Sequence, residues 1–97
     1  MDKQQAVRLK GILTVPADRL EAVRAALPEH IRLSRAEPGC IFFDVVEVAD
    51  NDGIFNVSEG FVDQAAFDAH QRRTRASDWW RVTDGIPRTY TITKGRA

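Results

Sequence analysis

The sequence predicts an α+β fold in which strands and helices follow each other in the order β-α-β-β-α-β. Three observations support this order: segments rich in β-branched and aromatic residues, amphipathic helical segments between them, and turn residues at the boundaries. Unknotted, right-handed connections arrange such a chain as a four-stranded antiparallel sheet with both helices on one face, the ferredoxin-like arrangement. We expect a single domain over residues 1–97.

The first half of the chain predicts a strand, a helix and a second strand. Residues 6–15 begin with alternating apolar and polar side chains, which is typical of a strand. Asp18 is expected to cap or start the following amphipathic helix. That helix should kink or restart at Pro28, which lacks an amide hydrogen. Residues 40–48 are β-branched and aromatic and predict the second strand.

The second half begins with a hairpin turn at Asp50–Gly53, because Asn, Asp and Gly tolerate positive φ angles. Asp63 is expected to cap a helix, and Ser77 or Asp78 a short helix that carries the two tryptophans. The remaining elements are predicted at residues 54–62 (strand), 64–75 (helix) and 89–93 (strand).

Polar side chains occupy the predicted inner face of the later helix. At about 100° per residue, Ala66, His70, Arg73 and Ser77 fall on one side. A helix that only packs would carry Leu or Val there. These groups need partners, and Glu59 lies on the apolar side of the preceding strand. The pattern therefore predicts that the helix lines a cavity.

Bulk composition excludes several classes of partner. The 14 basic and 14 acidic side chains cancel, so neither nucleic acid nor an anionic membrane is favoured. The single cysteine, Cys40, excludes an intrachain disulfide and a cysteine-cluster zinc site, and indicates a reducing cytoplasm. The first residues lack the apolar core of a signal peptide, and no apolar run is long enough to span a membrane.

The predicted strands carry apolar residues on both faces. In residues 40–48, Ile41, Phe43 and Val45 have one parity, and Phe42 and Val46 have the other. The face without helices should then be apolar too, and an exposed patch of that size implies a partner. We expect a homodimer packed through the sheet face.

Two motifs resemble the antibiotic biosynthesis monooxygenase (ABM) domain family. They are EPGCIFFDV, residues 37–45, and FNVSEGFVDQAAFDAH, residues 55–70. The resemblance rests on the E-P-G-C stretch, on Glu59 with Phe61, and on His70 with Thr74. It implies a dimeric α+β barrel with a pocket between sheet and helices in each protomer. Relatives oxygenate aromatic polyketides without metal or flavin, degrade haem, isomerise a signalling sugar or have no known activity.

Two residues argue against haem binding, although His70 could stand in for the helical histidine of haem-degrading relatives. Relatives that degrade haem use an Asn on the first strand, a Trp and a helical His. The first strand here has no Asn, and Phe61 stands where such a Trp is expected. With two histidines and no His/Glu pair at ligand spacing, no metal site is predicted either. We expect no cofactor: no metal, flavin or haem.

His70 and Glu59 are the predicted catalytic residues. An imidazole titrates near neutrality and suits proton transfer, and Glu59 would orient it. The alternative is a buried structural pair. The substrate pocket is predicted to include Arg73, Ser77, Trp80 and Tyr90, the alternatives being an ion pair, a helix cap and packing aromatics.

Two further residues are expected to play structural roles. His30 is predicted to lie on the solvent side of its helix, and Cys40 to be a buried, inert thiol.

These residues predict a cofactor-independent monooxygenase acting on a small aromatic or enolisable molecule. A non-catalytic, dimeric small-molecule binding protein is the alternative, and an isomerase on the same scaffold is a third. The enzyme hypothesis expects a titrating, solvent-reachable His70, whereas the binding hypothesis tolerates a buried and fixed one.

Overall fold

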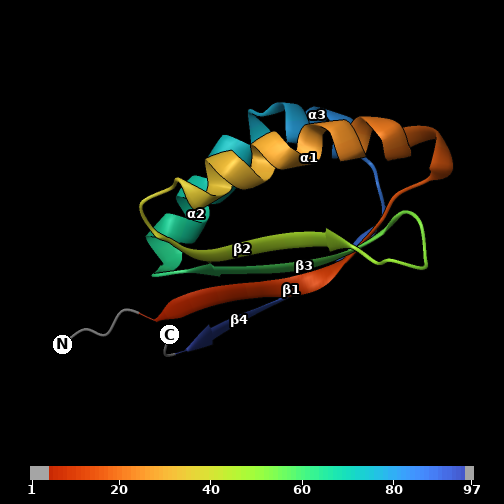
Figure 1. Ribbon diagram of the computed structural model, residues 1–97. Helices are drawn as coiled ribbons and strands as arrows, with labels where there is room; N and C mark the ends of the chain where they lie inside the picture. The colour runs from red at the N-terminus through yellow and green to blue at the C-terminus, as the bar shows by residue number, and fades with distance from the viewer. Residues whose placement is uncertain (1–4, 96–97) are drawn as a thin grey trace.

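The computed structural model describes residues 5–95. One sheet and one layer of helices make up the fold (Figure 1). The strands are β1 (Ala6–Thr14), β2 (Cys40–Glu47), β3 (Ile54–Phe61) and β4 (Arg88–Gly95). The helices are the 3-10 turn η1 (Ala17–Arg19), α1 (Leu20–Arg35), α2 (Gln64–Arg75) and α3 (Asp78–Thr83).

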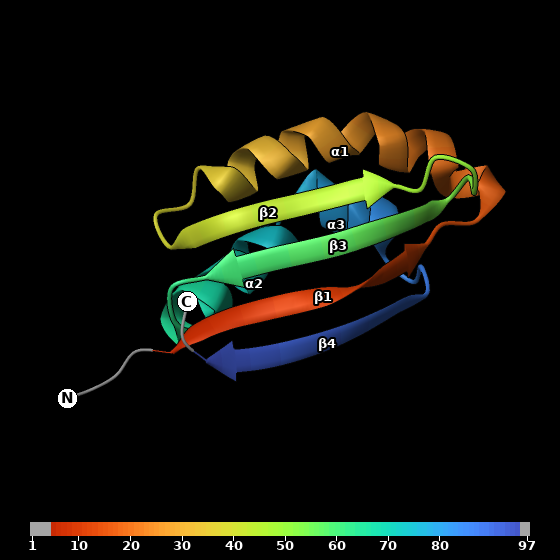
Figure 2. The same ribbon diagram turned by 60° about the horizontal axis from the view of Figure 1, so that its bottom comes forward.

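The sheet has the order β2-β3-β1-β4, and every neighbouring pair is antiparallel. Figure 2 shows this order from the side that carries no helix. The predicted ferredoxin-like α+β fold is therefore confirmed. Among the described helices, none has the length and apolar character that crossing a bilayer requires.

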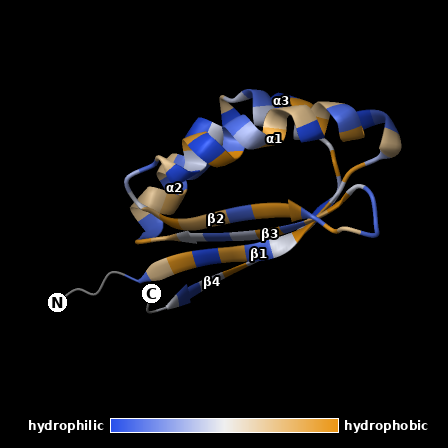
Figure 3. Ribbon diagram, in the orientation of Figure 1, coloured by the Kyte–Doolittle hydropathy of each residue, from blue (hydrophilic) through white to orange (hydrophobic). Residues whose placement is uncertain are grey.

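The core lies between the sheet and the helices. Apolar and polar residues alternate along most of β1 (Figure 3), and most of the apolar ones face the helices, whereas Ile12 lies on the open face. Val7, Leu9 and Leu13 are buried there beside the phenylalanines of β2 and β3. The core residues are Val7, Leu9, Leu13, Val15, Val23, Phe43, Val45, Phe55, Val57, Phe61, Phe67, Trp79 and Ile86.

Glycine at position 11 allows β4 to lie close to β1. A Cβ atom at Gly11 would lie 2.1 Å from the backbone oxygen of Thr89 and 2.4 Å from Cδ1 of Tyr90. The Tyr90 ring thus packs across the strand where any other residue would place a side chain. This packing brings the ring to the helix-facing side of the sheet.

Helix α1 differs from its prediction in two ways. Its first turn is the short η1, whose N-cap is Pro16 without a side-chain cap, so Asp18 caps nothing. The helix then continues through Pro28 to Arg35 without restarting. A proline removes one hydrogen bond, but the remaining helical hydrogen bonds and the packing of Val23 against the core keep the element continuous.

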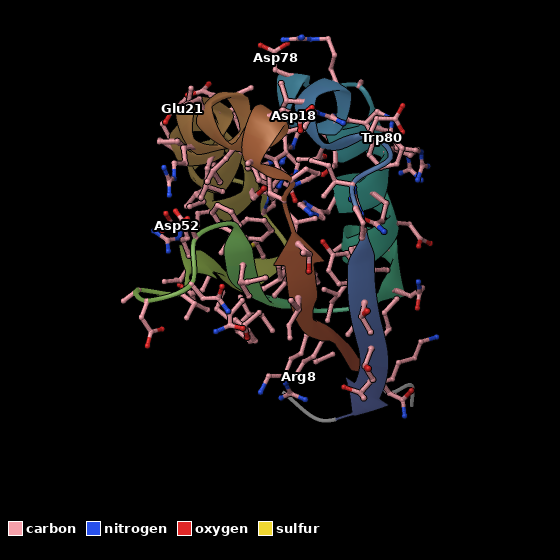
Figure 4. The ribbon with its side chains drawn as sticks, turned by 90° about the vertical axis from the view of Figure 1, so that its right-hand side faces the viewer. Arg8, Asp18, Glu21, Asp52, Asp78 and Trp80 are labelled. Carbon is pink, nitrogen blue, oxygen red and sulfur yellow. The ribbon has the colours of Figure 1, made fainter. Side chains whose placement is uncertain are left out.

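The open face of the sheet is more polar than predicted. Ile12 and Val46 are exposed there, but so are charged and polar side chains in the neighbouring rows. Arg8 points away from the helices in Figure 4. Ile41, expected to share a face with Phe43, lies at a β-bulge that shifts the register between β2 and β3. The second face is therefore apolar only in part, at residues such as Ile12 and Val46, and less so than the sequence predicts.

Candidate functional site

A pocket of about 460 Å³ lies between β1, β3 and β4 on one side and α2 and α3 on the other. This volume is in the range of small-molecule sites, roughly 300–1,000 Å³. Its walls combine aromatic side chains with titratable groups. The lining residues are Leu9, His30, Glu59, His70, Gln71, Thr74, Trp79, Trp80, Asp84, Gly85, Ile86, Arg88 and Tyr90.

Helix α2 places His70 at the inner wall of this pocket. Asp63 caps the helix by accepting a hydrogen bond from the amide of Ala66 at 2.8 Å, as predicted. The buried side of α2 is made of Phe67, His70 and Thr74. The predicted inner stripe is therefore rotated, with Thr74 rather than Arg73 on the buried side.

Two carboxyl groups flank the imidazole of His70. Nδ1 lies 3.0 Å from Oε1 of Glu37, and Nε2 lies 3.6 Å from Oε1 of Glu59. Because a carboxylate can only accept, Nδ1 donates to Glu37, and Nε2 of the neutral ring is left as an acceptor. The Thr74 hydroxyl lies 3.4 Å from the same Nε2. His70 is 2% exposed, so both nitrogens are held by the protein.

Glu59 is unusual because it is buried and, among residues 5–95, has no ion pair with a lysine or an arginine. Burial, with a smaller contribution from the negative charge of Glu37, raises its pKa to about 8. At neutral pH it is mostly a protonated carboxyl group and can donate towards Nε2 of His70. Burial lowers the pKa of His70, while Glu37 raises it.

Glu37 was not predicted as a site residue, although it begins the E-P-G-C motif. Its carboxylate accepts a hydrogen bond from Nε of Arg73 as well as from His70. Arg73 in turn donates from Nη2 to the hydroxyl of Ser34 at 2.9 Å. The sequence pointed to Glu37 only indirectly: the predicted inner face of the later helix carried hydrogen-bond donors without an assigned carboxylate partner. Glu37 itself lies in a turn, where no helical or strand periodicity marks a residue as inward-facing.

The structure brings four of the six predicted site residues to one pocket. His70, Glu59, Trp80 and Tyr90 line it, and Trp80 lies on the β4 side of the helix layer in Figure 4. Arg73 and Ser77 instead line a second pocket of about 490 Å³ between α1 and the other helices.

Ser77 follows α2 and caps α3, which explains its absence from the first pocket. Its hydroxyl accepts from the amide of Trp80 and donates to the carbonyl of Thr74 at 2.6 Å.

His30 is buried, so the prediction of a solvent-facing residue is wrong. It is 5% exposed, because α1 packs this side of its helix against α3 and β2. The ring stacks on Trp79 with centroids 4.7 Å apart and meets the edge of Phe43. Burial, with smaller effects from His70 and Arg73, lowers its pKa to about 3. His30 and Trp79 line both pockets and so form the wall between them.

Within residues 5–95, no group of three or more His, Cys, Asp or Glu side chains has an arrangement that could hold a metal ion. The chemistry that the pocket can perform with its own groups is proton transfer, through a carboxyl group, an imidazole and a carboxylate in sequence.

The fold and the site define a ferredoxin-like domain with a pocket of small-molecule size and a buried carboxyl–imidazole–carboxylate chain. The model of the antibiotic biosynthesis monooxygenase family matches residues 7–81. The chain therefore belongs to this family. No curated protein matches the sequence.

Solved structures share this fold. A candidate antibiotic biosynthesis monooxygenase from Nitrosomonas europaea has a TM-score of 0.80 at 24% identity, over 98% of this chain and 94% of that chain. Rv0793 from Mycobacterium tuberculosis has a TM-score of 0.70 at 26% identity, over 91% and 92%. SO0527 from Shewanella oneidensis has 0.73 at 26%, over 95% and 92%. At 24% identity, the likeness to the Nitrosomonas protein extends to the fold alone.

Proposed function

We propose that this protein is a cofactor-independent monooxygenase that acts on a small aromatic or enolisable molecule. The observation that carries the proposal is the contact of Glu59 with Nε2 of His70 at the wall of a pocket. A general acid–base group is most effective when its pKa lies near the working pH, and the value of about 8 for Glu59 meets that condition. Family membership supports the reaction class.

In the proposed mechanism, proton transfer comes first. Glu59 passes its proton to Nε2 of His70, and the resulting carboxylate takes a proton from the substrate. The imidazolium is stabilised by Glu37 at Nδ1. This assigns the orienting role to Glu37 and places Glu59 between the imidazole and the substrate.

Oxygenation then follows on the substrate anion. The anion donates electrons to O₂ and forms a carbon–oxygen bond with it, and the resulting peroxide anion takes up the proton that Glu59 removed. The peroxide loses water and leaves a carbonyl group, so one oxygen atom is retained and the other departs with two hydrogens. For the probe anthrone the balance is one anthrone and one O₂ giving one anthraquinone and one water.

Anthrone oxidation tests this proposal. The wild-type protein is expected to accelerate anthraquinone formation with matched O₂ uptake, and His70→Ala to lower the rate about 10²–10⁴-fold, the usual contribution of acid–base catalysis. Arg72→Ala is the matched control, because Arg72 lies exposed on the same helix, and should keep the wild-type rate. A folded His70→Ala variant with the wild-type rate would contradict the mechanism.

A specific observation favours the non-catalytic alternative, a small-molecule binding protein. His70 is buried and held at both nitrogens, as the binding hypothesis tolerates. The same experiment separates the two hypotheses. If anthrone or related aromatics bind but O₂ uptake stays at the background rate, the protein binds without chemistry.

We also propose that two copies pair through the open face of the sheet. Support comes from the exposed Ile12 and Val46 on that face, and from the resemblance to dimeric α+β barrels. Mass measurement at low micromolar concentration should give a dimer. Ile12→Glu should give monomers, whereas Ala22→Glu, which adds the same charge on α1, should stay dimeric. A stable wild-type monomer at this concentration would contradict the proposed pairing of two copies.

A further inference from the structure

Strand β4 contributes to the wall of the pocket that His70 lines. Arg88 and Tyr90 lie on the helix-facing side of this strand, opposite Leu13 and Gly11 of β1. Both line the pocket. Glu59 pairs with Leu9 on the same face. The β1 partners of Arg88, Tyr90 and Glu59 are every second residue of that strand. The three residues therefore follow each other along the sheet at intervals of roughly 7 Å.

The guanidinium of Arg88 is fixed in place by the backbone. Nε donates to the carbonyl of Ile86 at 3.1 Å, and Nη2 donates to the carbonyl of Thr83. A guanidinium has five N–H groups, so three are left after these two contacts. Arg88 also acts on the phenol of Tyr90, because its positive charge partly opposes the rise of the Tyr90 pKa. Arg88 and Tyr90 thus present prearranged donors to the pocket.

The positive charge of Arg88 takes part in none of the ion pairs that residues 5–95 form. Of the two acidic residues that line the pocket, Asp84 is exposed, and Glu59 is mostly protonated at neutral pH. His30 is neutral there. Arg88 is therefore the one permanently charged cation among the residues that line this pocket.

Tyr90 is suited to donate to an anion beside Arg88. Burial raises the pKa of its phenol, so the hydroxyl keeps its proton at neutral pH. A planar guanidinium fork next to a hydroxyl is an arrangement that recognises a carboxylate, because both carboxylate oxygens receive charge-assisted hydrogen bonds.

We infer that the ligand of this pocket is an aromatic or enolisable carboxylate. Its carboxylate group is held by Arg88 and by the hydroxyl of Tyr90, and its acidic hydrogen lies beside Glu59, further along the sheet. This inference rests on the proposed function, because both place the reacting atom at Glu59. It adds the substrate class and names Arg88 and Tyr90 as the residues that determine it.

The experiment compares the binding of 2-naphthoate with that of its neutral isostere 2-naphthamide at pH 7. The wild-type protein should bind the carboxylate about 10–100-fold more tightly than the amide, which is the effect of charge-assisted hydrogen bonds. Equal binding of the two probes, or tighter binding of the amide, would overturn the inference.

Three variants assign the preference to residues. Arg88→Gln should bring the ratio of the two dissociation constants close to one. Tyr90→Phe keeps the ring and should reduce the ratio about 3–10-fold, and it tests the inference even if loss of the Arg88 contacts to Ile86 and Thr83 unfolds the first variant. Arg81→Gln, at an exposed position of α3, should leave the ratio unchanged.

A fourth variant separates this inference from the proposed function. His70→Ala should abolish turnover of anthrone but retain the preference for naphthoate, since it leaves β4 untouched. A carboxylate preference without turnover in the wild-type protein would support the inference and contradict the monooxygenase. If a folded Arg88→Gln or Tyr90→Phe variant keeps the full preference, the carboxylate subsite is wrong.

Discussion

The Glu59→Gln variant is expected to be more stable than the wild-type protein at pH 8, by about 4 kcal/mol in the free energy of unfolding. The reason is that burial raises the pKa of Glu59 from 4.5 to about 8 in the folded protein. Glutamine has the shape of the protonated acid and can still donate to Nε2 of His70, but it never has to be ionised. The gain should vanish below about pH 4.5.

The sign follows from proton binding in the two states. Between pH 4.5 and 8 the folded protein holds a proton on Glu59 that the unfolded chain has lost. Stability from this group is complete below the unfolded pKa and is lost as the pH rises through the folded value. His30 has the opposite effect on the free energy of unfolding between about pH 3 and pH 6.5: its folded pKa is lowered, so stability from this group rises with pH there. The pKa of His70 is lowered too, so below pH 6.5 this group also makes stability rise with pH.

Above pH 6.5 the Glu59 effect is therefore unopposed. Wild-type stability should fall by about 2 kcal/mol between pH 6.5 and 8, and the Glu59→Gln variant should not show this fall. Urea denaturation at a series of pH values measures both curves. Glu21→Gln is the control, because Glu21 is exposed and should leave the wild-type curve unchanged. Parallel wild-type and Glu59→Gln curves would show that Glu59 is ionised in the folded protein.

The Glu37→Gln variant is expected to lose about 2 kcal/mol of stability, less than the ~3–5 kcal/mol typical of a fully enclosed ion pair. Glu37 and Arg73 are 17% and 29% exposed, and solvent moderates the loss. One oxygen of Glu37 accepts from His70 and the other from Arg73. Glutamine has one acceptor oxygen, so its amide nitrogen would face one of these two donors.

A second readout of this variant reports on the site itself. Glu37 raises the pKa of His70, so its neutral replacement should lower that pKa further, as measured by NMR titration of the imidazole. The matched control is Glu29→Gln. Glu29 pairs with Arg32 through two hydrogen bonds, but on an exposed helix surface. Its loss should leave the denaturation midpoint nearly unchanged. Equal losses of stability in Glu37→Gln and Glu29→Gln would mean that the burial of Glu37 does not strengthen its interactions.

The fold was largely predictable from local patterns. The helix at Gln64–Arg75 has the predicted bounds, and Asp63 and Ser77 cap α2 and α3 as expected. The fourth strand is longer than predicted, because pairing with the central β1 extends it from Arg88 to Gly95. A threonine-rich segment gives no sign of that length, since the hydrogen bonds that fix it come from residues more than 70 positions away.

The site was predictable only in part. His70 could be identified because a polar residue stood out on a periodic helix. Glu37 lies in a turn 33 residues earlier, where no period relates it to His70. Nor could spacing decide which of two adjacent tryptophans is buried: Trp79 packs on His30, and Trp80 is exposed at the pocket.

The sequence by itself determined the order of the elements, the caps of α2 and α3, and the side of β3 on which Glu59 lies. These properties depend on neighbours within a few residues, which periodicity and turn chemistry report directly. Only the tertiary structure decided that Glu37 accepts the hydrogen bond from Nδ1 of His70 and that Glu59 lies beside Nε2. The bulge in β2 and the packing of α1 on α3 set distances of a few ångströms between distant segments, and no local pattern encodes them.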